Sequence, residues 1–335
     1  MAVDVGELVA RFGVGAPTAP PRPLGGASSA AASAVDTARG RWVVKTVVPL
    51  GDWHARAIAT ACRLERAAWA AGVLTARRLE PPAPALGYWH DAGGLLVRVI
   101  EFVDGRPAPW PVDASLAAWT GRTLARVATL GLPGDLALDE SAPLHPLAEW
   151  RSWVDEARAG GFAVAEPAGR LLPAVADATE LVESALAARP PALLAHRDVS
   201  PANLLARRTG GYELLDWDHA GPAVPWWEAV HTAFRCASPP TRDAPTAPPS
   251  PAAVRATVEA YLAAGGPPGP ADQTAFAGAL RSMLAWAAYS LWLALGHRVA
   301  TPERRARAAA DVAAAAAALP AFLGSLDGWS RLLRA

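Results

Sequence analysis

The chain has 335 residues, of which 52% are hydrophobic and 19% charged, so it is long and apolar enough for about two domains, or for two lobes of one protein. Lysine plus arginine equals aspartate plus glutamate at 31 each, and the zero net charge excludes the concentrated positive charge with which proteins bind nucleic acid. The two cysteines, Cys62 and Cys236, lie far apart, which argues against a disulfide scaffold and indicates a reduced, cytoplasmic setting.

No targeting or membrane-spanning segment is expected. The N-terminal residues 1–8 begin acidic and lack the basic and apolar regions of a signal peptide. The longest apolar stretch, residues 283–295, is short of the roughly 18 residues that span a bilayer. We therefore expect a soluble, cytoplasmic protein without a membrane partner.

The N-terminal third carries alternating helix and strand signals. In chain order we predict a short helix over 7–12, a loop over 25–35, a strand over 42–48, a helix over 55–71 and a strand over 95–103. Strand, helix and strand in this order predict a small α+β lobe over residues 1–105.

The remaining residues, 106–335, predict a larger and mainly helical lobe. Helices are predicted over 115–130, 144–159, 171–188, 252–263, 272–295 and 301–319, with short strands in the insert 193–216 and a proline-rich loop over 237–253. The last helix has a clear start, because Thr301 is a good N-cap residue and Pro302 suits the first helical position.

The insert contains a hairpin signal, since two apolar runs flank Thr209-Gly210-Gly211. A turn centred between Thr209 and Gly210 places Asn203 opposite Asp216, with Cα atoms about 5 Å apart; a turn at Gly210-Gly211 would displace Asn203 by one pair. An amide oxygen beside a carboxylate suits Mg²⁺. Asp198, five residues before Asn203, would be held near that ion and could accept a proton from an attacking hydroxyl.

His196-Arg197-Asp198, then Asn203, then Asp216 have the order and spacing of a phosphoryl-transfer site. Lys45 in the middle of its strand would reach the α- and β-phosphates, and Glu65 on the following helix would pair with it. The phosphates would be covered by Gly25, Gly26, Ser28 and Ser29.

In these motifs the chain resembles the aminoglycoside phosphotransferase and choline kinase-like family, the small-molecule branch of the protein-kinase fold. Residues 196–203 are similar to the family's His-Gly-Asp-x-x-x-x-Asn box, 215–218 to its Ile-Asp-Trp-Glu box and 99–105 to its hinge. The resemblance covers roughly 20–235. It implies an α+β, two-lobed fold with a small β-rich N-terminal lobe and a larger, mainly helical C-terminal lobe.

The resemblance also implies roles for particular residues. The backbone of Glu101 and Val103 would bind the adenine edge, Asn203 and Asp216 would hold Mg²⁺, and Asp198 would deprotonate the acceptor. The chain has three departures from the patterns of the fold: its glycine-rich loop has only two adjacent glycines, Arg197 replaces the family's usual glycine, and the interval after Asp216 is short.

The implied reaction is transfer of the γ-phosphoryl group of ATP or GTP to a hydroxyl of a small molecule, such as an aminoglycoside antibiotic. The interval from Asp216 to Trp227 leaves no room for an activation loop, which favours a small acceptor over a protein. Two alternatives stay open. One is a metabolite kinase with a choline-, sugar- or homoserine-like acceptor. The other is a non-catalytic, pseudokinase-like nucleotide-binding module, which the thin glycine-rich loop favours.

Four residues at the end of the second box or close behind it are candidates for contact with the acceptor: Asp218, Trp226, Trp227 and Glu228. Packing in the core is the other interpretation of the two tryptophans. His196 is expected to be a structural hydrogen-bonding residue rather than a catalyst.

Overall fold

The structure is a computed structural model that describes residues 5–24, 31–81, 83–110, 112–140, 142–238 and 248–334. By their contacts the residues form two compact units, Met1–Ala108 with His196–Gly221, and Pro109–Ala195 with Pro222–Ala335. The insert therefore groups with the N-terminal residues, whereas the expected boundary at 105/106 places it in the second lobe. The physical reason is that the first strand of its hairpin, residues 204–207, pairs with a strand at residues 105–107.

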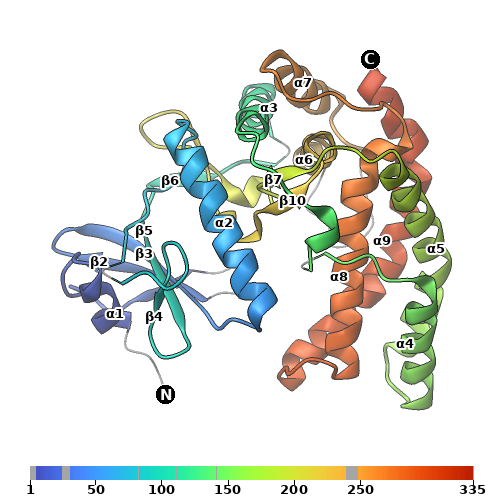
Figure 1. Ribbon diagram of the computed structural model, residues 1–335, viewed down its shortest axis with the longest axis horizontal. Coiled ribbons are helices and arrows are strands. Elements are labelled where there is room, and N and C mark those ends of the chain that lie inside the picture. Colours follow the sequence, from blue (N-terminus) through green and yellow to red (C-terminus); the bar gives the residue numbers. More distant parts are fainter. Residues whose placement is uncertain are drawn as a thin grey trace. The chain divides into compact units, whose positions relative to one another are not determined.

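The first unit contains a five-stranded antiparallel sheet in the order β1-β2-β3-β5-β4. Figure 1 labels its strands β2, β3, β4 and β5. Its elements are α1 (Val5–Arg11), β1 (Arg22–Leu24), β2 (Ala31–Thr37), β3 (Gly40–Val47), α2 (Asp52–Ala70), β4 (His90–Asp91) and β5 (Leu96–Glu101). The loop expected over 25–35 is wrong for residues 31–35, which belong to β2. These small residues have little strand preference of their own, and pairing with β3 decides their conformation.

Side chains alternate across this sheet and meet a different helix on each face. Trp42 and Val44 pack with residues of α1, while Val47 packs with residues of α2. Lys45 therefore lies on the α2 face, and the register places Arg98 of β5 directly opposite it. Two cations side by side on a buried face require acidic partners.

A second sheet in this unit has the order β6-β8-β9. Its strands are β6 (Gly105–Pro107), β8 (Leu204–Arg207) and β9 (Tyr212–Leu214). Leu204 pairs with Leu214, so Asn203 lies opposite Leu215 and the expected pairing of Asn203 with Asp216 is wrong by one residue.

The register differs because the turn is longer than the sequence suggested. The Arg207 N–H donates to the Gly211 carbonyl at 3.0 Å, which leaves three residues, 208–210, in the loop. Gly210 and Gly211 have φ of 91° and 85°, left-handed conformations that cost glycine little. Three-residue hairpin loops of this kind place a glycine in the left-handed region, and this shifts the whole ladder.

The second unit is mainly helical. Its elements are α3 (Ala114–Thr129), α4 (Leu147–Ala159), α5 (Ala165–Ala187), β7 (Leu193–Ala195), β10 (Gly221–Ala223), α6 (Pro225–Ala237), α7 (Pro251–Ala263), α8 (Ala277–Leu295) and α9 (Pro302–Arg334). Each helix expected in this half of the chain is present, with ends shifted by a few residues except for α9, which continues to Arg334. Of the proline-rich loop, residues 239–247 lie outside the described residues.

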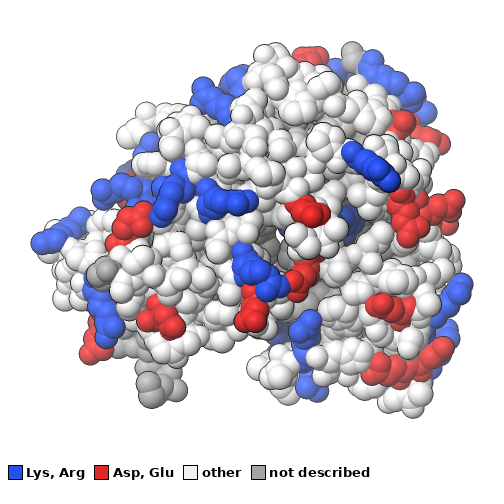
Figure 2. Space-filling model, viewed as in Figure 1, with Lys and Arg blue, Asp and Glu red and all other residues white. Residues whose placement is uncertain are grey.

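Figure 2 shows basic and acidic side chains interspersed among uncharged ones on the face that it draws. The distribution agrees with the equal numbers of acidic and basic residues in the chain.

In the described ranges one helix, α9, is long and apolar enough by length and composition to cross a membrane. Its most apolar window has a mean hydropathy of 1.6, and 17% of that window is buried. The helix expected over 301–319 does not contain the whole of this stretch, because it ends before Pro320. Within the second unit α9 packs against α5 and α8, and its buried side chains include Val312, Leu319 and Leu326.

Helices α3 and α7 approach closely at Gly121, where an added Cβ would lie 2.1 Å from the carbonyl oxygen of Thr257. We expect Gly121→Ala to lower the free energy of unfolding by about 1–3 kcal/mol, because backbone on both sides must move apart. Gly324→Ala in α9 is the matched control, since an added Cβ there meets nothing within 4 Å. Urea unfolding should show a loss for the first variant and none for the second; equal midpoints for Gly121→Ala and the wild type would contradict the prediction.

Candidate active site

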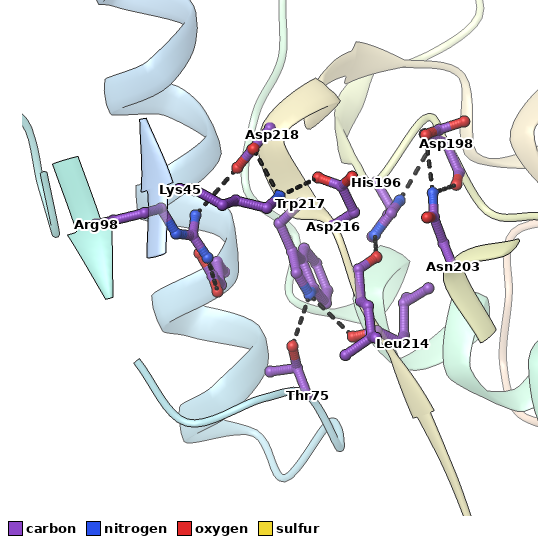
Figure 3. Close-up of polar contacts among 12 residues, drawn as sticks. Lys45, Thr75, Arg98, His196, Asp198, Asn203, Leu214, Asp216, Trp217 and Asp218 are labelled. Carbon is purple, nitrogen blue, oxygen red and sulfur yellow. Dashed lines mark hydrogen bonds and ion pairs between the residues drawn. The ribbon is translucent and has the colours of Figure 1, made fainter. Parts of the chain in front are cut away.

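Lys45 is the central cation of the site and is 9% exposed. Its Nζ donates to Asp216 Oδ1 at 2.6 Å and to Asp218 Oδ2 at 2.8 Å (Figure 3). Burial acts to lower the pKa of Lys45, but the two carboxylates outweigh burial and raise that pKa above its ordinary value. Lys45 is therefore charged at neutral pH, and an ammonium with three donors has one left for a further acceptor.

Arg98 is a second cation in the same cluster and is 3% exposed. Its Nη2 donates to Glu65 Oε1 at 3.0 Å and its Nη1 to Asp218 Oδ1 at 3.1 Å. The expected ion pair between Lys45 and Glu65 is therefore wrong in this structure, because Arg98 takes Glu65 while Lys45 takes Asp216 and Asp218. A guanidinium has several N–H donors in a fork and can reach two carboxylates at once. This suits the position of Arg98 between Glu65 on α2 and Asp218 in residues 215–218.

Asp218 lies between these two cations with its side chain 20% exposed. Burial acts to raise the pKa of Asp218, but Lys45 and Arg98 outweigh it and hold that pKa well below its ordinary value. Asp218 is thus an anion that orients Lys45 and Arg98. Its expected contact with the acceptor stays a prediction that this geometry does not favour.

Asp198 and Asn203 form a second cluster at the start of the hairpin. The 3₁₀ turn Pro201–Asn203 brings the amide back to Asp198, so that Asn203 Nδ2 donates to both the backbone oxygen and Oδ2 of Asp198, each at 2.8 Å. These two bonds fix the orientation of the amide. They leave Asn203 Oδ1, an oxygen with acceptor capacity, directed away from Asp198.

The backbone is left-handed at two non-glycine residues next to or within this machinery. Arg197 has φ of 67° and Asp216 has φ of 61°. The family's usual glycine at the position of Arg197 would adopt this conformation without strain, whereas arginine does so at a cost. At Asp216 the same conformation ends β9 and turns the chain so that its carboxylate meets Lys45.

His196 connects the two clusters. It is fully buried, its Nε2 lies 3.0 Å from the Leu215 carbonyl oxygen, and the Asp198 N–H points to its Nδ1 at 3.3 Å. The carbonyl can only accept and the N–H can only donate, so the neutral tautomer with the proton on Nε2 satisfies both partners. Burial lowers the pKa of His196 to about 4, although Asp198 and Asp216 both act to raise it. As expected, His196 is a structural hydrogen-bonding residue.

The lowered pKa predicts how stability depends on pH. In the unfolded chain His196 takes up a proton near its ordinary pKa of 6.5, whereas in the fold it does so only near 4. The stabilisation is therefore complete above about pH 6.5 and is lost as the pH falls toward 4, by up to about 3 kcal/mol. Urea unfolding of the wild type and of His196→Gln between pH 7 and pH 4.5 measures this, and parallel pH profiles would contradict it.

Trp217, between the two aspartates of the second box, anchors that box to a segment that the sequence did not single out. Its Nε1 donates to Thr75 Oγ1 at 2.9 Å, and its ring lies edge-on to His196 with centroids 4.7 Å apart. The Leu214 N–H also donates to the Leu74 carbonyl at 3.0 Å. Thr75 and Arg98 were missed because nothing in the local sequence pattern shows what a buried hydroxyl or guanidinium contacts.

The remaining predicted residues divide into three groups. Gly25, Gly26, Ser28 and Ser29 lie outside the described residues. The backbone N–H of Glu101 donates to the Arg77 carbonyl at 2.7 Å. Of the backbone groups of Glu101, the carbonyl is therefore the one left to bind the adenine edge, together with the backbone of Val103.

Trp226 and Trp227 are each 4% exposed within the second unit, and Glu228 is half-buried on the same helix. Trp226 Nε1 donates to the Pro270 carbonyl at 2.8 Å. Their burial favours packing over contact with an acceptor.

The oxygen donors present fit a magnesium ion. Asp216 offers a carboxylate on the side chain that is 37% exposed, and Asn203 offers the Oδ1 that its amide orientation leaves available. Among the described residues there is no group of three or more His, Cys, Asp or Glu side chains that could hold a metal by itself. A site with two protein oxygens suits Mg²⁺, because this ion usually completes its coordination with water molecules and with the phosphate oxygens of the substrate.

An antiparallel sheet with a buried lysine that meets an aspartate just beyond a hairpin, followed in the chain by a mainly helical region, is the arrangement of the protein-kinase-like fold. The profile of the phosphotransferase enzyme family matches residues 21–269. The chain belongs to this family and is an ATP-dependent phosphotransferase of small molecules. Comparison with curated proteins finds no match.

Several solved structures share the fold. A spectinomycin phosphotransferase in complex with ADP and spectinomycin has a TM-score of 0.66 and 12% identity over 96% of this chain and 100% of that chain. An aminoglycoside phosphotransferase from Alicyclobacillus acidocaldarius has a TM-score of 0.56 and 17% identity over 99% and 98%. A Plasmodium vivax ethanolamine kinase has a TM-score of 0.57 and 12% identity over 89% and 82%. At these identities the likeness concerns the fold.

Proposed function

We propose that the enzyme transfers the γ-phosphoryl group of ATP to a hydroxyl of a small molecule, with Asp198 as the base and Lys45 on the nucleotide phosphates. The observation that carries this proposal is the contact of Lys45 with Asp216, which are 171 positions apart in the chain. His196 joins that contact to the Asp198–Asn203 pair, because its ring contacts both the carbonyl of Leu215, the neighbour of Asp216, and the backbone N–H of Asp198. A phosphoryl-transfer site needs these groups within one cluster.

Asp198 would orient the acceptor hydroxyl and accept its proton. Two contacts hold Asp198 for this role, the Asn203 amide on Oδ2 and the His196 ring on its backbone N–H. Because His196 is neutral above about pH 4, it accepts that N–H without competing as a base near neutral pH. The proton acceptor is thereby positioned before the substrate arrives.

Asn203 and Asp216 would hold Mg²⁺. When bound, the ion neutralises charge on the transferring phosphoryl group. Lys45 would donate its remaining N–H to the nucleotide phosphates. The carbonyl of Glu101 and the amide of Val103 would hydrogen-bond the adenine ring of the nucleotide. Asp216 would serve two partners, because one of its oxygens accepts from Lys45.

The acceptor is proposed to be small. Only a 3₁₀ turn at Trp217–His219 and β10 lie between Asp216 and the start of α6 at Pro225, all within described residues. This is too short for a platform that binds a protein substrate. We propose first an amine-bearing antibiotic, because one protein of similar fold is named an aminoglycoside phosphotransferase and another a spectinomycin phosphotransferase. We propose second an amino alcohol, as in the ethanolamine kinase of similar fold.

We also infer a cytoplasmic location. The donor is ATP, and Cys62 and Cys236 are free and buried rather than paired. Unpaired cysteines are usual in a reducing compartment.

A two-stage experiment tests the proposal. Thermal shift with MgATP and each acceptor class, namely aminoglycosides, spectinomycin, macrolides, choline, ethanolamine, sugars and homoserine, identifies binders, because a ligand that binds the fold raises Tm. Mass spectrometry then follows each binder for the mass of one added phosphoryl group. A phosphorylated hydroxyl supports the proposal. Nucleotide binding without a phosphorylated product from any class would favour the pseudokinase alternative instead.

A further inference from the structure

The buried charges around Lys45 form one continuous chain of contacts that begins on α2. Glu65 contacts Arg98, Arg98 contacts Asp218, and Asp218 contacts Lys45, at 3.0, 3.1 and 2.8 Å. Lys45 then contacts Asp216 at 2.6 Å. Side-chain exposure is 2% at Glu65 and 4% at Arg98, so the ion pair between these two residues is screened from water.

The position of Arg98 is set by the sheet on one side and by an aromatic ring on another. It lies directly opposite Lys45 in the ladder between β3 and β5. The ring of Trp89 lies 5.5 Å from the guanidinium carbon, a distance at which a ring face attracts a cation. A side chain held by its strand and by a ring has few other orientations, so it transmits the placement of Glu65 to Asp218.

The cluster is not optimised for stability. Glu65 Oε2 and Arg98 Nε are buried and make no hydrogen bond to any described group. Buried ions with unmet hydrogen-bonding capacity are costly, and well-packed apolar side chains of similar volume are often as stable or more so. Arg98 is buried at this energetic cost directly beside Lys45, which indicates that Arg98 serves to place Lys45.

We propose that Arg98 is a positioning residue for the nucleotide-binding lysine. It replaces that lysine as the partner of Glu65, and it holds Asp218 in the orientation that directs Lys45 toward the phosphates. Arg98 itself contacts no substrate in this proposal, which rests on the proposed function of Lys45.

A double-mutant cycle on Arg98 and Lys45 tests this, with the dissociation constant of MgADP measured by calorimetry. Arg98→Met is expected to weaken MgADP binding about tenfold, the loss of one charge-assisted contact. In the Arg98→Met/Lys45→Met variant binding is expected to be no weaker than in Lys45→Met alone, because Arg98 then has no lysine to orient. A merely structural arginine gives losses that add.

Two further variants sharpen the cycle. Arg98→Lys keeps the charge but can reach one carboxylate instead of two, so its MgADP affinity should lie between those of the wild type and Arg98→Met; it also serves the cycle if Arg98→Met does not fold. Arg66→Met is the matched control, because Arg66 follows Glu65 on α2 but contacts Tyr88 and Glu80 instead. Its effect should be absent or should add to that of Lys45→Met.

The outcomes separate the two proposals. Wild-type affinity in Arg98→Met, or losses that add with Lys45→Met, would overturn the role of Arg98 while leaving the phosphotransferase assignment of Lys45 intact. Failure of the wild-type chain to bind MgADP would overturn both.

Discussion

Replacing Asp198 with asparagine is expected to lower kcat by about 10³-fold while MgADP binding changes little, because the variant loses the proton acceptor and keeps the shape of the side chain. Asn203 Nδ2 also donates to the Asp198 backbone oxygen, so the turn keeps one of its two bonds in the variant. Product formation on the acceptor identified by thermal shift gives kcat, and calorimetry gives nucleotide affinity.

Asp155→Asn is the control for this substitution, since Asp155 lies on α4 with its side chain 74% exposed. It should retain wild-type kcat. If Asp198→Asn also retained wild-type kcat, Asp198 would not be the base, whatever the acceptor.

Replacing Asp216 with alanine is expected to lower kcat by about 10²–10³-fold at saturating ATP and to shift the Mg²⁺ dependence to higher concentrations. The variant loses a carboxylate oxygen for the ion and at the same time one of the two acids that hold Lys45. Both losses lower activity. Asp218 is then the one remaining acid that orients Lys45, and Asn203 is the one remaining residue that offers the ion an oxygen. Activity titrated with MgCl₂ measures both.

Asp36→Ala provides a matched control in the first unit, where Asp36 of β2 is half-exposed and pairs with Arg41. We expect its Mg²⁺ dependence to be that of the wild type. An unchanged Mg²⁺ dependence in Asp216→Ala would remove Asp216 from the metal site.

Local features of the site and fold could be predicted from the sequence alone. Asp198 and Asn203 lie five residues apart, so one turn brings them together, and the structure has them hydrogen-bonded. Helices such as α3 and α8 were predicted within a few residues because an amphipathic or long apolar run specifies a helix wherever it packs. These are short-range properties, which depend on residues that are neighbours along the chain.

Other features could not be predicted, because they depend on long-range contacts. The partner of Lys45 is an example: Glu65 on the next helix is the nearer acid in sequence, yet Lys45 contacts Asp216 and Asp218. Glu65 is instead the partner of Arg98, which lies opposite Lys45 in the ladder. Which carboxylate a buried cation meets is decided by the sheet register and by competition with other cations, and neither is visible in a local pattern.

Residue order and spacing by themselves determined that this chain carries an acid, an amide and a second acid suited to phosphoryl transfer, and a lysine on a strand before a helix. Only the tertiary structure decided how the charges pair, where the hairpin turns, and that α9 continues past Pro320. The reason is physical. Helix and turn preferences act over a few residues, whereas charge pairing in a buried cluster minimises the cost of removing several ions from water together, and that cost depends on all the elements that surround them.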